Sequence, residues 1–163
     1  MKRSTMSDSY KDEIYDIAVN TFEVTCYMFP MEEWELEEIE EQALPENGIR
    51  SVVGFNGAAE GQMIITPSND LLSAIAANML GVDNPDKDQK AGALCEIANI
   101  ICGNTVPLFA GADNICYIEP PRIVESNWEA VSQSDELHKE LLQIYLDEGR
   151  AEIRVHYSIA GEA

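Results

Sequence analysis

The sequence predicts an α+β fold, in which an antiparallel sheet packs against about three helices. Apolar residues recur with helical spacing in three segments, residues 8–28, 68–81 and 92–104. They alternate with polar residues in two others, 49–67 and 138–158, and a glycine-containing turn interrupts each of these as in a hairpin. Helices and hairpins mixed along one chain in this way are typical of the α+β class.

Length and charge limit the domain number and the partners. The chain has 163 residues, 45% of them hydrophobic, which suits one ordinary core, so we expect a single domain over 1–163 with 1–8 as a flexible N-terminus. The net charge of −20 argues against nucleic acid and anionic membranes as partners, because both attract clustered Lys and Arg. The sequence has neither a signal peptide nor a run of about 20 apolar residues, so we expect a cytoplasmic location.

The first predicted helix covers residues 8–28. Its helix-like positions are Ile14, Ile17, Ala18, Thr21, Phe22, Val24 and Thr25. Pro30 is expected to end this helix, because proline cannot donate a backbone hydrogen bond. The next segment, residues 31–48, is dense in glutamate but contains Trp, Leu and Ile. We therefore expect an exposed edge strand with one solvated face rather than a disordered acidic tail.

The middle of the chain predicts a hairpin followed by a helix. The apolar runs RSVVGFNG and AAEGQMIITP, within residues 49–67, are separated by a glycine-containing turn. Helical spacing follows in 68–81, with Ser68 suited to the N-cap and Gly81 to the C-cap. The polar segment 82–90 is expected to be a surface loop.

The last third of the chain predicts extended structure. The segment ICYIEPPRIVES reads as two short extended pieces broken at Pro120 and Pro121, since proline cannot donate to a central ladder. The segment 138–158 predicts a second hairpin that turns at Asp147–Arg150. A helix over residues 139–149 is the alternative that this pattern leaves open.

The central helix, GALCEIANIICGN at residues 92–104, is apolar on most sides but carries a polar pair, Glu96 and Asn99. Residues three and four apart share a helix face, so this pair forms one stripe with Gly92 and Gly103. We predict that the stripe is exposed, while Leu94, Ala98 and Ile101 are buried. Two interpretations remain open: the pair solvates an outer face, or it forms a site that another surface approaches closely. Asn104 is expected to cap the helix end.

The four cysteines show no metal-binding signature. No CxxC pair occurs, and neither histidine lies at a metal-ligand spacing from a cysteine. We expect all four to be reduced core residues and the chain to need no metal or other cofactor of its own.

The segment CEIANIICGN, with its Glu-x-x-Asn pair followed by Gly-Asn, and the later proline in YIEPPRIV together resemble the CheC/CheX group of chemotaxis phosphatases. The upstream segment VVGFNGAAEGQMIITPSNDLLSAIAANMLG is similar to this group in its order of hairpin and helix. The likeness covers roughly residues 10–125. It is closer to CheX than to CheC, whose members carry the pair on two helices, because the first helix here has only Asn20 and Glu23 in reversed order. The resemblance implies the CheC/CheX fold and one site per chain.

The resemblance also implies an activity, hydrolysis of the aspartyl phosphate of a CheY-like response regulator. Asn99 would orient the attacking water, as a carboxamide does in other phosphoryl transfers, and Glu96 would pair with the active-site lysine of the regulator. The expected partners are this phosphorylated regulator, which carries its own Mg²⁺, and a second copy of the chain in a homodimer formed through sheet edges.

The sequence departs from the group at Gly92, where the group usually has Asp or Ser four residues before the glutamate. This departure supports an alternative function, a non-catalytic CheX-like dimeric binding or scaffold domain. The two hypotheses share one fold and differ in whether Glu96 and Asn99 perform chemistry.

Overall fold

The structure is a computed structural model that describes residues 10–36, 44–45, 48–111, 114–125 and 138–161. The expected flexible N-terminus, residues 1–8, lies outside the described residues.

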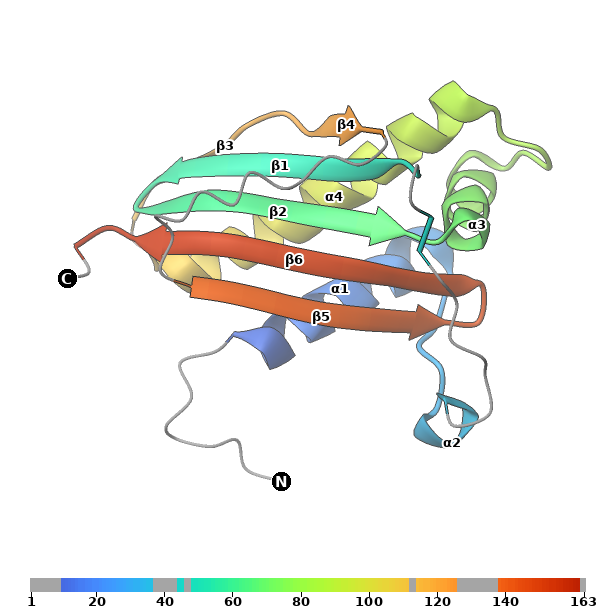
Figure 1. Cartoon of the computed structure of the whole chain (residues 1–163), viewed down its shortest axis with the longest axis horizontal. Helices are drawn as coiled ribbons and strands as arrows, with labels where there is room; N and C mark the ends of the chain where they lie inside the picture. Colours follow the sequence, from blue (N-terminus) through green and yellow to red (C-terminus); the bar gives the residue numbers. More distant parts are fainter. Residues whose placement is uncertain (1–9, 37–43, 46–47, 112–113, 126–137, 162–163) are drawn as a thin grey trace.

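In the described part of the chain, six strands form one antiparallel sheet (Figure 1). The strand order is β3-β1-β2-β6-β5, and β4 also pairs with β1. The strands are β1 (Arg50–Gly57), β2 (Ala59–Pro67), β3 (Cys116–Ile118), β4 (Arg122–Val124), β5 (His138–Leu146) and β6 (Gly149–Ile159). The α+β prediction is therefore confirmed.

Both predicted hairpins are present. β1 pairs with β2, and β5 pairs with β6 through the turn that begins after Leu146. The helical alternative for residues 139–149 is therefore wrong. β3 and β4 lie on either side of Pro120 and Pro121 and both pair with β1, as the break at the prolines predicted.

Three longer helices cover one face of the sheet, behind the strands in Figure 1. They are α1 (Lys11–Cys26), α3 (Asn69–Leu80) and α4 (Lys87–Ala110). The predicted caps of α3 are confirmed. The hydroxyl of Ser68 accepts a hydrogen bond from the backbone N–H of Leu71, and Gly81 has a left-handed φ of 69°.

The core lies between this sheet face and the helices. Its strand residues alternate along the chain, as with Val53 and Phe55 of β1 or Ile153 and Val155 of β6. From the helices, Phe22, Leu71 and Ile97 are fully buried against them, among other residues. The alternation places most of the polar side chains of the strands on the other face of the sheet, together with the apolar Val52, Ile64 and Leu141.

The expected edge strand in residues 31–48 is wrong where the structure describes it. Residues Glu33–Leu36 form a short helix, α2, and residues 37–43 and 46–47 lie outside the described part. The carboxylate of Glu35 accepts a hydrogen bond from the backbone N–H of Glu32 at 2.7 Å, which starts a helical turn locally. The pattern of apolar and glutamate residues in this segment does not show that Glu35 bonds back to the backbone of Glu32.

Pro30 does not end the first helix. α1 ends at Cys26, because Tyr27 adopts a left-handed φ of 58° and its N–H bonds to the carbonyl of Glu23. Pro30 instead forms a bridge with Leu146 at the outer edge of β5.

The central helix is longer than predicted at both ends. It begins at Lys87, where Asp86 and Gln89 form a reciprocal capping box, so the loop before it is shorter than expected. It continues to Ala110 through Pro107. Asn104 therefore does not cap the helix end. Its side-chain amide donates to the carbonyl of Ile100 at 3.0 Å, inside the helix.

Candidate functional site

α4 holds the candidate site, because it lies in the middle of the helical layer. It contacts α1 on one side, α3 on the other and the sheet beneath. Leu94, Ala98 and Ile101 are fully buried, as predicted. Because these contacts occupy three sides of α4, only its fourth side is left to face the solvent.

The fourth side of α4 is the predicted polar stripe. Gly92, Glu96, Asn99 and Gly103 are all exposed, which confirms the predicted orientation. Residues three apart on a helix have Cβ atoms about 5–6 Å apart, so the carboxylate and the carboxamide can touch one bound group. Neither side chain hydrogen-bonds to another described residue, and each is therefore available to a partner.

The two glycines of the stripe have no role in internal packing. A Cβ atom added at Gly92 or Gly103 would meet no atom within 4 Å, and neither residue has a positive φ. Each glycine costs roughly 1 kcal/mol in helix propensity relative to alanine. No contact within the described chain explains why glycine stands at these two positions. Because they lack side chains, the helix backbone is open to the solvent on both sides of Glu96 and Asn99.

Among the described residues, no group of three or more His, Cys, Asp or Glu is placed to hold a metal ion.

Length and composition alone would let α4 cross a membrane, but 56% of its apolar window is buried inside the protein. The contacts of this helix with α1, α3 and the sheet account for its apolar character.

The cysteines are all free thiols, and two of them differ from the expected buried state. Cys26 and Cys102 are buried, whereas Cys95 and Cys116 are partly exposed. Burial raises the pKa of Cys102 to about 12, with a smaller contribution from Cys116. Burial, with Glu148 nearby, raises the pKa of Cys26 to about 11, and burial also raises the pKa of Cys95.

These pKa values predict the thiol reactivity of the folded protein. At pH 8 we expect Cys26 and Cys102 to react with a thiol reagent only on unfolding, because the thiolate is the reacting form. Both pKa values are raised by folding. The stability that the neutral thiols contribute is therefore complete below pH 9 and is lost as the pH rises toward 11–12. Counting reactive thiols with and without denaturant checks the first expectation, and rapid reaction of all four in the native protein would contradict it.

Comparisons with known proteins agree with this architecture. The family model of the chemotaxis phosphatase CheX matches residues 49–145. Comparison with curated proteins gives no match.

Three solved structures are similar to this one over nearly their whole length. CheX in a CheX-CheY-BeF3-Mg²⁺ complex from Borrelia burgdorferi is 19% identical, with a TM-score of 0.68, covering 93% of this chain and 99% of that one. CheX from Vibrio vulnificus is 16% identical, with a TM-score of 0.69 and coverages of 96% and 100%. A CheC-like protein from Shewanella sp. PV-4 is 18% identical, with a TM-score of 0.69 and coverages of 94% and 99%.

At these identities the solved structures establish the fold. The family match is more specific, because it covers more than half of the chain and includes the hairpin β1–β2, α3 and the whole of α4. The chain belongs to the CheX family of chemotaxis phosphatases.

Proposed function

We propose that this protein hydrolyses the aspartyl phosphate of a CheY-like response regulator, with Glu96 and Asn99 as its site. The observation that carries the proposal is the exposure of this pair on α4, between two glycines that no internal contact requires. The Borrelia burgdorferi relative in complex with CheY supports a regulator of this kind as the partner.

The chemistry suits the two residue types. An acyl phosphate is already activated, so its hydrolysis depends on positioning and charge stabilisation more than on a strong base. In the proposed complex the carboxamide of Asn99 enters the active site of the regulator and holds a water molecule in line with the phosphorus. The water oxygen bonds to phosphorus as the aspartyl oxygen leaves, which gives inorganic phosphate and a free carboxylate.

Glu96 serves binding in this proposal. Its carboxylate is one helical turn from Asn99 and has no partner among the described residues, so it can form a charge-assisted hydrogen bond with a lysine of the regulator. The Mg²⁺ belongs to the regulator, which agrees with the Mg²⁺ in the CheY complex of the relative. In this proposal Asn99 determines the rate of dephosphorylation, and Glu96 contributes mainly to the affinity for the regulator.

The experiment that tests the function is the loss of label from a phosphorylated regulator of the same cell. We expect the label to disappear faster when the full-length protein is added, in proportion to its concentration. Unchanged decay with every regulator of that cell would favour the non-catalytic binding domain, the alternative that Gly92 supports. Binding to a regulator without faster decay would identify that alternative directly.

The glycines of the stripe give a second test. Gly92→Ala and Gly103→Ala should each raise the free energy of unfolding by up to about 1 kcal/mol, because alanine has the better helix propensity and the added methyl group meets no atom. If the regulator docks closely over the stripe, each change should lower the phosphatase rate. Thermal unfolding and label decay measured on the same samples check both expectations, and variants that are both more stable and fully active would contradict close docking.

We also propose that the chain, residues 1–163, acts as one domain in the cytoplasm and forms a homodimer through a sheet edge. β5 is an edge strand, and its C-terminal end is already covered. Pro30 bridges to Leu146, and the backbone N–H of Met31 donates to the carbonyl of Tyr145 at 2.9 Å. A second copy could therefore add to β5 only at its N-terminal half, which limits the length of a shared ladder.

The homodimer predicts a mass of twice 18.1 kDa in light scattering at micromolar concentration. Leu141→Pro, in the N-terminal half of β5, should lower this mass if the edge pairs with a second copy, because proline cannot donate to the ladder. A monomeric parent protein would count against the dimer.

A further inference from the structure

The sheet face opposite the helices, here called the outer face, gathers the cations of an acidic chain. By strand alternation it presents five of the ten Lys and Arg residues of the sequence, Arg50, Arg122, Lys139, Arg150 and Arg154. The described carboxylates on the same face are Glu60, Glu119 and Glu152. Among the described residues of a protein with a net charge of −20, cations thus outnumber carboxylates on this face, and such a local field attracts anions.

A pocket of about 340 Å³ opens on this face, over β5 and β6. Lys139, Leu141, Arg154 and His156 line it together with Glu140. In the register, Lys139 lies opposite His156 and Leu141 opposite Arg154, so these four side chains share the outer face. The volume is at the lower end of that of small-molecule sites, about 300–1,000 Å³.

Glu140 does not neutralise the pocket. Its side chain belongs to the other face of β5, where its Oε2 accepts hydrogen bonds from the Tyr157 hydroxyl and the Tyr10 backbone N–H, each at 3.4 Å. Among the described residues, Lys139 has no ion-pair partner. The charged residues that line the pocket from the outer face are therefore Lys139 and Arg154, and Arg154 is paired with Glu152 beside the pocket.

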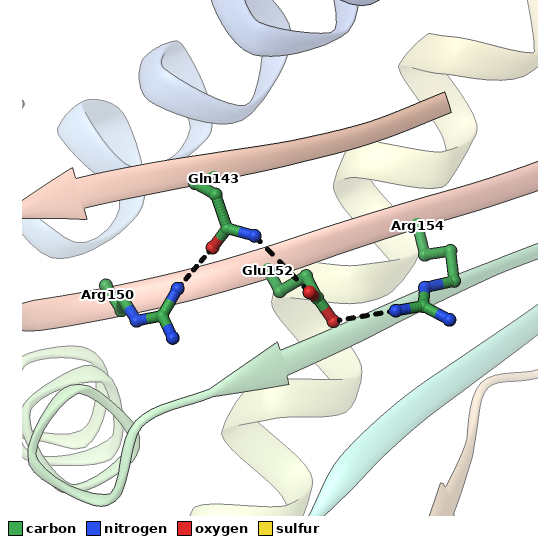
Figure 2. A network of polar contacts seen from close by, with 4 residues as sticks. All are labelled: Gln143, Arg150, Glu152 and Arg154. Atoms are coloured by element: carbon green, nitrogen blue, oxygen red, sulfur yellow. Dashed lines mark hydrogen bonds and ion pairs between the residues drawn. The ribbon is translucent and has the colours of Figure 1, made fainter. Parts of the chain in front are cut away.

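A chain of hydrogen bonds along β5 and β6 holds Arg154 at the pocket (Figure 2). Arg154 Nη2 donates to Glu152 Oε1 at 3.3 Å, and Glu152 Oε2 accepts from Gln143 Nε2 at 3.3 Å. Gln143 Oε1 in turn accepts from Arg150 Nη1 at 2.5 Å. The contact with Glu152 uses one of the five N–H donors of the Arg154 guanidinium. The group is thus held in place and still has N–H donors for an oxyanion.

His156 is the second indication of a ligand. It is only 5% exposed, and its Nδ1 has no hydrogen-bond partner, although buried polar atoms are nearly always satisfied. Burial lowers its pKa, and the charges of Lys139 and Arg154 lower it further, which favours the neutral imidazole. Across the ladder on β2, its neighbour is the uncharged Gln62. Two cations and a buried imidazole thus converge at this pocket, and the described carboxylate paired with them, Glu152, contacts Arg154.

We propose that this pocket binds an oxyanion of a small organic ligand, a carboxylate or a phosphate group, between Lys139 and Arg154. His156 lies beside the bound group, and the 46% exposed side chain of Leu141 contacts the apolar part of the ligand. The site lies on the opposite face of the sheet from Glu96 and Asn99 and is independent of the proposed reaction.

The chain has only two histidines, which makes the test direct. The imidazole NMR signals of His156 and His138 are followed while inorganic phosphate or butyrate is added, with sodium chloride at matched ionic strength as the control. We expect a saturable shift at His156 with a rise in its pKa, and a smaller effect at His138, which stacks on Tyr157 toward the core. Tighter saturation by one probe identifies the preferred oxyanion. Shifts that follow ionic strength alone overturn the proposal.

Variants then locate the binding site. Lys139→Gln and Arg154→Gln should each weaken binding roughly tenfold, as the loss of a charge-assisted hydrogen bond does. Leu141→Ala should weaken the binding of butyrate and leave that of phosphate unchanged. Lys90→Gln, on α4 in the helical layer, removes the same charge and is the matched control. If it weakens binding as much as Lys139→Gln, the effect is one of net charge, and the proposed pocket is wrong.

Discussion

Asn99→Ala is expected to lower the maximal rate at which a bound, phosphorylated regulator is dephosphorylated, by on the order of 100-fold, which is the effect of losing the orientation of a reacting group. Affinity for the regulator should change little. An interaction that forms only in the transition state contributes to turnover and not to ground-state binding. Single-turnover decay of the label, measured at saturating protein, gives the rate without a contribution from binding.

Two variants on the same helix act as controls for this experiment. Glu96→Ala should weaken regulator binding, because it removes the proposed charge-assisted contact. Asn104→Ala removes the same amide five residues beyond Asn99, where it donates to the carbonyl of Ile100, and should leave the rate unchanged. All three side chains are exposed, so unfolding free energies should stay within about 0.5 kcal/mol of the parent. Full activity of a well-folded Asn99→Ala protein would refute the catalytic role.

The candidate pair could be oriented from the sequence because α4 is apolar on nearly every other side. In such a helix a single polar stripe must face away from the core. The residues of the stripe are those that lie three or four positions apart in the sequence. The hairpins could be predicted for a related reason. Period-two alternation places residues such as Ile153 and Val155 on the core face, and a register slip of one residue would expose all of them.

The features that could not be predicted depend on contacts between segments distant in sequence. The short helix at Glu33–Leu36, where the sequence predicts an edge strand, follows the bridge of Pro30 to β5. The sequence predicts that Pro30 ends α1, but Pro30 instead forms a bridge with Leu146 of β5. The pocket on the outer face likewise exists only because the β5–β6 register brings Lys139 opposite His156.

Gly61→Ala is expected to lower the free energy of unfolding by about 3 kcal/mol, at the upper end of the cost of overpacking. Gly61 lies opposite Tyr157 where β2 meets β6. A Cβ atom there would overlap the carbonyl oxygen of His156 and lie 2.7 Å from the Cα atom of Tyr157. Both are backbone atoms, so the strain cannot be relieved by a side-chain rotation, and the central strands must separate. The melting temperature should fall by on the order of 5–10 °C.

Gly92→Ala is the matched control, because the same methyl group is added where it meets no atom within 4 Å. Both changes restrict the unfolded chain in the same way, so the difference between them reports the folded state. The two variants should therefore shift stability in opposite directions, Gly92→Ala upward and Gly61→Ala downward, in chemical denaturation followed by circular dichroism. A Gly61→Ala protein as stable as the Gly92→Ala protein would mean that β2 and β6 do not approach as closely as Gly61 permits. The β5–β6 hairpin, and with it the pocket at His156, would then be held less firmly against the rest of the sheet.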